Sequence, residues 1–150
     1  MEKIKFKTEI QASAEKVWDI LFGVESYPKW AAAFAEGSSV TTDWKKGSKA
    51  LFHDESGKNG IFAIIQDSVP NKFLSIKHLG ELKDGKEILK PDWGETVENY
   101  SLEEHDSITA LSIEMDIPTD WKDYFQKTWP KALEKVKLLA EDGTQDHKET

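Results

Sequence analysis

The chain has 150 residues, of which 38% are hydrophobic and 32% charged, with no cysteine and a formal net charge of −8. A chain of this length forms one globular domain that folds without disulfides or a structural metal, and the absence of cysteine excludes a cysteine nucleophile and thiolate metal sites. The acidic balance, with lysines interleaved among acids, argues against a surface for nucleic acid.

The first residues show no export or membrane signal. Residues 1–5 alternate charged and apolar side chains and lack the apolar run of a signal peptide. No stretch approaches the roughly 18 apolar residues of a membrane span. We therefore expect a cytoplasmic protein without a membrane span.

The N-terminal third predicts one strand followed by two short helices. Residues 3–10 alternate apolar and polar side chains, which is typical of a half-buried strand. Ser13 is placed to cap a helix over residues 14–22, where apolar residues recur at helical spacing, and Gly23 ends it. A second short helix is predicted to begin near Ser26, with Pro28 in its first turn.

The middle of the chain predicts six strands separated by turn residues, and the spacing favours an antiparallel meander. A longer connection over residues 80–94 is predicted to be a surface excursion at the edge of the sheet. The six strand-like segments cover residues 38–43, 48–53, 60–68, 73–79, 96–103 and 108–116.

The C-terminal part predicts one long helix and a tail. Thr119 is placed to cap a helix that runs to about Ala140 with an apolar stripe over five turns, and Pro130 within it predicts a kink. Residues 143–150 contain no apolar side chain and are predicted to form a disordered acidic tail after a single domain over residues 1–142.

Together these elements predict an α+β helix-grip fold. A curved antiparallel sheet of about seven strands must wrap around the long C-terminal helix, because both carry an apolar surface to bury. The two short helices complete the layer, and the fold encloses whatever space the long helix leaves unfilled.

Five short strings of residues, each within or beside a predicted element, occur in an order that is typical of one known superfamily. They are residues 14–18, 27–30, 44–48, 69–74 and 128–135. Through them the chain resembles the START-like, birch-pollen-allergen-like (SRPBCC) superfamily, over residues 1–142. Within that superfamily it resembles the group named for the C-terminal domain of the heat-shock-protein-90 ATPase activator. The resemblance implies the helix-grip fold but no single activity, since the superfamily includes ligand carriers, polyketide cyclases and co-chaperone domains.

Polar residues on the inner strand faces are the candidates for a site. No histidine pair has metal-ligand spacing, and the sequence lacks phosphate-loop and serine-hydrolase motifs, so we expect no metal, no cofactor and no catalytic residues. Strand alternation predicts a few polar side chains among apolar ones facing the interior. They either pair with one another or hold a ligand's polar end. The candidate ligand-binding residues are Leu51, His53, His78, Glu98, Tyr100, Met115, Phe125 and Trp129.

Three functions follow as hypotheses. The first is binding of a small hydrophobic or amphipathic molecule in a cavity between the sheet and the C-terminal helix, by a monomer or weak dimer. The second is a chaperone-associated interaction module, as the resemblance implies. The third is a cyclase- or hydrolase-type enzyme that uses His53 or His78 as acid or base, although the sequence offers no convincing pair of catalytic groups.

Overall fold

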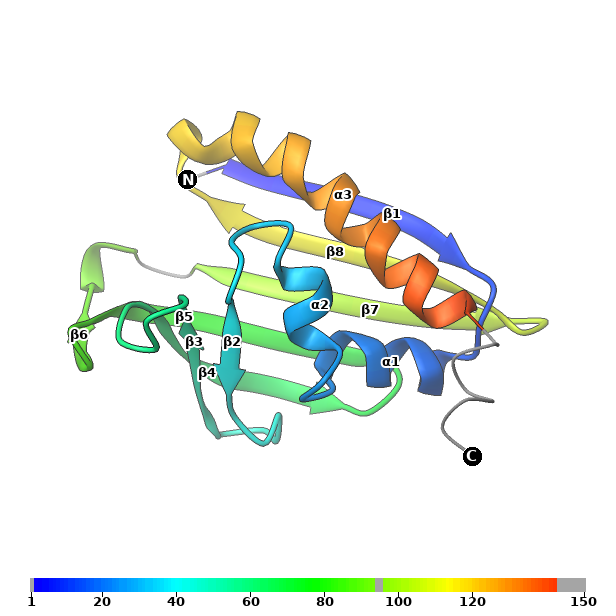
Figure 1. Ribbon diagram of the computed structural model, residues 1–150, viewed down its shortest axis with the longest axis horizontal. Helices are drawn as coiled ribbons and strands as arrows, with labels where there is room; N and C mark the ends of the chain where they lie inside the picture. Colours follow the sequence, from blue (N-terminus) through cyan, green and yellow to red (C-terminus); the bar gives the residue numbers. More distant parts are fainter. Residues whose placement is uncertain (1, 94–95, 143–150) are drawn as a thin grey trace.

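A computed structural model describes residues 2–93 and 96–142, and the predicted C-terminal tail lies outside these residues (Figure 1). It shows the α+β architecture expected for the helix-grip fold, a curved antiparallel sheet with two short helices and a long C-terminal helix. In chain order the elements are β1 (Glu2–Ile10), α1 (Ala14–Phe22), α2 (Tyr27–Ala31), β2 (Ser39–Thr41), β3 (Lys49–His53), β4 (Gly60–Val69), β5 (Phe73–Lys83), β6 (Lys86–Leu89), the 3₁₀ turn η1 (Pro91–Trp93), β7 (Val97–His105), β8 (Ile108–Ile117), the 3₁₀ turn η2 (Thr119–Trp121) and α3 (Lys122–Glu141).

The first helix begins where its cap predicts. The side-chain oxygen of Ser13 accepts a hydrogen bond of 3.2 Å from the backbone N–H of Lys16, which satisfies one of the free donors at the helix start. Gly23 follows the last residue of α1, and α2 begins one residue after Ser26. The predictions for both helices are confirmed.

In the part of the chain that the structure describes, the sheet contains eight strands rather than about seven. Its order is β1-β8-β7-β5-β4-β3-β2, all neighbours are antiparallel, and β6 pairs with the extended end of β5. The expected surface excursion is therefore partly a hairpin, because Asp84 and Gly85 both adopt positive φ and form a tight turn. Gly80 permits the close pairing, since a Cβ there would lie 1.9 Å from the carbonyl oxygen of Ile88.

The long helix begins later than its sequence suggests. Thr119 opens the 3₁₀ turn η2, and α3 starts at Lys122 without a side-chain cap, so the prediction that Thr119 caps the helix is wrong. The extended backbone of Pro118 and the tighter turn after it place Thr119 a full turn ahead of the α-helical hydrogen bonds. From Lys122 the helix continues through Pro130 to Glu141.

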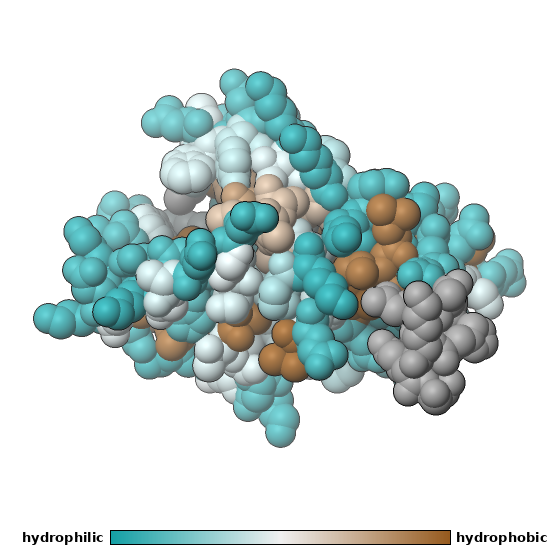
Figure 2. All heavy atoms as spheres, viewed as in Figure 1, coloured by the Kyte–Doolittle hydropathy of each residue, from teal (hydrophilic) through white to brown (hydrophobic). Residues whose placement is uncertain are grey.

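The three helices lie on one face of the sheet and bury its inner side chains (Figure 1). One part of the core lies where α1 and α3 pack over β1 and β8. Fully buried residues there include Ile10, Val17, Leu21, Leu111 and Val136. The face drawn in Figure 2 is mostly hydrophilic, with hydrophobic patches interrupted by charged side chains.

Candidate functional site

A pocket of about 750 Å³ lies between the inner face of the sheet, α2 and the start of α3. Its walls come from ten separate elements or their connections, and aromatic side chains predominate among them. The lining residues are Tyr27, Trp30, Ala31, Phe34, Ala35, Ser38, Ser39, Phe52, His53, Asp54, Gly60, Ile61, His78, Glu81, Trp93, Thr96, Val97, Glu98, Tyr100, Met115, Asp116, Ile117, Pro118, Trp121, Tyr124, Phe125 and Trp129.

A second hollow of about 580 Å³ lies beside α1 and the end of α3. Charged and small polar side chains of α1 and the following turn dominate its lining, which includes Glu15, Lys16, Asp19 and Lys29. Its polar lining suits water better than an apolar molecule, so the aromatic pocket is the candidate site.

Three polar side chains meet on the sheet wall of the aromatic pocket. Glu98 Oε1 lies 3.2 Å from His78 Nε2, and Glu98 Oε2 accepts a hydrogen bond from the Tyr100 hydroxyl. The strand register produces this meeting, because Glu98 lies opposite Ile76 of β5 and Tyr100 lies opposite Leu74. Residues 74, 76 and 78 of β5 share the inner face, so the His78 imidazole lies beside the inner side chains of β7.

The two tyrosines near Glu98 keep their protons. Burial raises the pKa of Tyr100 well above its ordinary value of 10, and the negative charge of Glu98 raises it further. The pKa of Tyr27 is raised for the same two reasons, burial first. Both hydroxyls are therefore hydrogen-bond donors at neutral pH.

Aromatic rings surround this polar cluster. The ring of Phe52 lies nearly parallel to that of His78, with 6.4 Å between centroids and 18° between planes. On the helix side, Trp129 contacts Tyr100 at 6.3 Å and Phe34 at 4.9 Å. The buried Trp129 Nε1 has no hydrogen-bond partner within the described part of the chain. The cluster therefore has aromatic side chains on both its sheet side and its helix side.

Seven of the eight predicted ligand-binding residues line the pocket, and Leu51 does not. The prediction that Leu51 faces the interior from β3 is wrong, because the buried Ala50 and the half-buried Phe52 point inward instead. His53 lies at the rim, and its Nε2 is 2.9 Å from Thr41 Oγ1 of β2 rather than beside Glu98. The structure brings together His78, Glu98, Tyr100, Met115, Phe125 and Trp129 around the pocket.

Sequence reasoning missed Tyr27 and Phe52. The signal for Phe52 was present, because Ala50 and Phe52 form the other alternating row of their strand. Tyr27 lies at the start of a five-residue helix, where no periodicity assigns a face.

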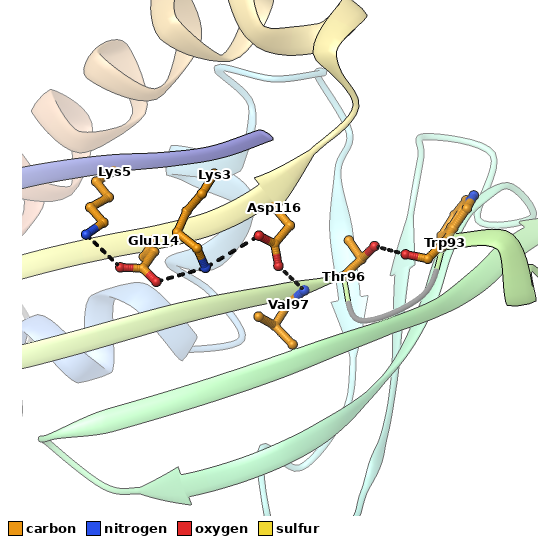
Figure 3. A network of polar contacts seen from close by, with 7 residues as sticks. All are labelled: Lys3, Lys5, Trp93, Thr96, Val97, Glu114 and Asp116. Atoms are coloured by element: carbon orange, nitrogen blue, oxygen red, sulfur yellow. Dashed lines mark hydrogen bonds and ion pairs between the residues drawn. The ribbon is translucent and has the colours of Figure 1, made fainter. Parts of the chain in front are cut away.

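Asp116 contributes to the pocket edge, but its carboxylate lies on the opposite side of the sheet. Its Oδ1 is 3.5 Å from Lys3 Nζ, and its Oδ2 accepts a hydrogen bond of 3.3 Å from the backbone N–H of Val97 (Figure 3). Lys3 also pairs with Glu114 at 3.1 Å. Met115 between the two acids points into the core, so alternation separates this outer ion-pair network from the pocket.

Within residues 2–93 and 96–142, no three His, Asp or Glu side chains gather in a group that would hold a metal ion. None of the helices in these same segments is long and apolar enough to span a membrane.

The curved sheet, the long helix and the pocket between them define a START-like helix-grip protein. The model of the family described as activator of Hsp90 ATPase homolog 1-like protein matches residues 11–141. The chain therefore belongs to this family. No curated protein matches the chain in sequence.

Solved structures share the fold at low sequence identity. The Aha1 dimer from Colwellia psychrerythraea has a TM-score of 0.74 and 22% identity, covering 95% of this chain and 98% of that one. Protein MLL2253 from Mesorhizobium loti has a TM-score of 0.71 and 18% identity, with the same coverage of 95% and 98%. CalU16 from Micromonospora echinospora has a TM-score of 0.66 and 15% identity, covering 94% and 66%.

Proposed function

We propose that the protein binds a small amphipathic molecule in the aromatic pocket. The single observation that carries this proposal is the chemistry of the walls: aromatic side chains surround one compact polar group of His78, Glu98 and Tyr100. A pocket of about 750 Å³ falls in the size range of small-molecule sites, which combine apolar walls with a few placed polar groups. The apolar part of the ligand contacts the rings, and its polar end lies beside Glu98.

The position of α3 supports access to this pocket. Trp121 and Tyr124 at the start of the helix line the pocket and are 53% and 40% exposed, so the pocket reaches the surface there. Phe125 lies one position deeper along the helix and is half-buried. A molecule therefore enters at this end of the pocket, beside Trp121 and Tyr124.

The test uses the neutral fluorescent probe N-phenyl-1-naphthylamine. We expect saturable binding to the unmodified protein with one site per chain. Phe125→Asp places a charge in the pocket wall and should weaken the probe's Kd at least tenfold, because it removes a ring and adds a solvated carboxylate. Gln126→Asp adds the same charge at the next, exposed position outside the pocket lining and should change the Kd less than about twofold.

Thermal melts accompany both titrations and show that each variant is folded. Absence of saturable binding to the unmodified protein would overturn the proposal. Equal effects of the two substitutions would also contradict it, because the probe would then respond to charge and not to the pocket.

A chaperone-associated role is the second candidate, and family membership is the observation that favours it. It is tested by adding the purified protein to an Hsp90-type chaperone and measuring ATP hydrolysis. A concentration-dependent rise, retained in Phe125→Asp, would support a role on a surface separate from the pocket. An unchanged rate over the same concentrations would contradict this role.

A further inference from the structure

The charged side chains that line the pocket are all acidic. The sequence contains no arginine, so all 20 of its basic residues are lysines. Among the described lining residues none is a lysine, whereas four are acidic: Asp54, Glu81, Glu98 and Asp116. Arginine and lysine are the residues that bind carboxylates and phosphates, so the described walls offer an anionic head group no fixed cation.

Three of the four acids are engaged away from the centre of the pocket. Asp116 pairs with Lys3 across the sheet, Glu81 Oε1 lies 3.8 Å from Lys90 Nζ, and Asp54 accepts bonds from the backbone and hydroxyl of Ser56. Glu98 is different, because its side chain lies on the inner face of the sheet, where it contacts His78 and Tyr100 of the pocket wall.

Glu98 retains capacity for a ligand. Its two recorded partners in the described chain are the Tyr100 hydroxyl and the His78 imidazole, and neither is a lysine. An ionised carboxylate offers about four acceptor positions, so two remain after these bonds. The two donors also hold the carboxylate in place, so the Glu98 side chain loses less conformational entropy when a ligand binds.

The rings near Glu98 favour the same kind of partner. Tyr27 and Phe52 have centroids 6.4 Å apart, and the ring of Phe52 on β3 lies nearly parallel to that of His78 on β5, two strands away in the sheet. Aromatic faces carry partial negative charge and attract cations, most strongly where water is excluded. An inner carboxylate framed by aromatic faces is a suitable environment for a substituted ammonium group.

We infer that the ligand is a cationic amphiphile: an alkyl or aryl amine, or a quaternary ammonium compound, whose positive nitrogen lies beside Glu98. This inference rests on the proposed function, because it requires the pocket to bind an amphipathic molecule. The apolar part of the molecule lies against Trp129 and Phe125. A fatty acid or other anion should bind least well, because its carboxylate would lie near Glu98 and the pocket lining contains no lysine to compensate.

The experiment compares three ligands with the same ten-carbon chain: decyltrimethylammonium, decanol and decanoate. The two ionic compounds are titrated below their micelle concentrations and decanol below its solubility limit, with intrinsic tryptophan fluorescence and calorimetry as readouts. We expect decyltrimethylammonium to bind at least tenfold more tightly than decanol, and decanoate to bind most weakly. The three head groups test the charge preference without any change to the protein.

Two variants locate the effect. Glu98→Gln keeps the shape and removes the charge, and it should weaken decyltrimethylammonium about tenfold while changing decanol less than twofold. Glu103→Gln removes the same charge from an exposed position on the same strand, outside the pocket lining, and should change neither affinity. If Glu98→Gln does not fold, the three-ligand comparison on the unmodified protein decides the question alone.

The outcomes separate this inference from the proposed function. Tight binding of decanol or decanoate, equal to or better than the cation, overturns the charge preference while supporting a pocket for amphiphiles. An unchanged affinity of the cation in a folded Glu98→Gln protein overturns the assignment to Glu98. No saturable binding of any of the three compounds overturns the proposed function and this inference together.

Discussion

The two halves of α3 lie on the same sheet, but the second half is packed into the core and the first half borders the pocket. From Thr128 onward the helix buries one side chain per turn or more, with Ala132 and Val136 completely inaccessible. Before Thr128 no residue of the helix is buried, and Tyr124 and Phe125 line the pocket instead. One continuous helix therefore forms a filled core at one end and a pocket wall at the other.

The difference comes from what lies opposite each half. α1 packs against the second half of α3 and fills the space above the sheet with Val17 and Leu21. The first half faces the five-residue α2 and its loop, which are too short to fill the same volume. Stability should therefore depend on the filled end, and binding on the pocket end.

The largest effect is expected from Leu133→Asp in the filled half. The side chain is 6% exposed, and burial of an unpaired carboxylate there should cost more than about 4 kcal/mol, enough to prevent cooperative folding. Leu138→Asp introduces the same group at a 57% exposed position of the same helix and should leave the melt nearly unchanged. Circular dichroism during heating distinguishes the two. A native-like melt of Leu133→Asp would remove the contrast between the two halves.

A pair of truncations compares the two ends directly. Leu21→Ala in α1 leaves a cavity in the filled end and should cost about 2–5 kcal/mol. Phe125→Ala removes a larger side chain but should cost only about 1 kcal/mol, because its ring already borders open space. Urea unfolding measures both values. Equal losses would show that the pocket wall carries as much stability as the core.

Tyr100→Phe tests a residue that belongs both to the core and to the pocket wall. The substitution removes the hydroxyl that donates to Glu98, and loss of a hydrogen bond to a charged group should cost about 1.5–3 kcal/mol. Tyr124→Phe removes a 2.7 Å bond to the neutral carbonyl of Phe34 at an exposed position and should cost less than about 1 kcal/mol. A reversed order in chemical denaturation would argue against a structural role for the polar cluster.

The smallest effect is a decline of stability in alkali. Because the pKa values of Tyr27 and Tyr100 are raised in the folded protein, their contribution is complete below pH 10 and is lost as the pH rises above it. Unfolded chains release these protons near pH 10 while folded chains retain them. We expect a loss of about 1 kcal/mol per pH unit for each tyrosine, and a shallower decline in Tyr27→Phe. An identical slope in the variant would contradict this origin.

Most of the fold was predictable because its signals are local. Ser13 and Gly23 bound α1, and period-two alternation locates most strands. The two errors in the fold concern β6 and the start of α3. The pair Asp84 and Gly85 permits a hairpin, but β6 forms only because it also pairs with β5. The start of α3 is delayed by the 3₁₀ turn after Pro118.

The candidate site was less predictable, since it depends on which face of each strand turns inward. Alternation placed His78, Glu98 and Tyr100 on the inner rows, because His78 shares its parity with Leu74 and Ile76, and the other two share theirs with Leu102. It failed in β3, where Leu51 and Phe52 are both apolar and either row could be the inner one. The hydrogen bonds that join the three side chains depend on the register of β5 and β7, which no local pattern reveals.

The pairing of β1 with β8 has a consequence for the time course of folding. Glu2 lies opposite Ile117 and Ile10 opposite Thr109, so the first strand completes its ladder only with one of the last. On the ribosome, β1 must therefore wait without its partner until nearly the whole domain has been synthesised. Closing so long a loop slows the search for the native state, and we expect refolding to be slow for a chain of this size.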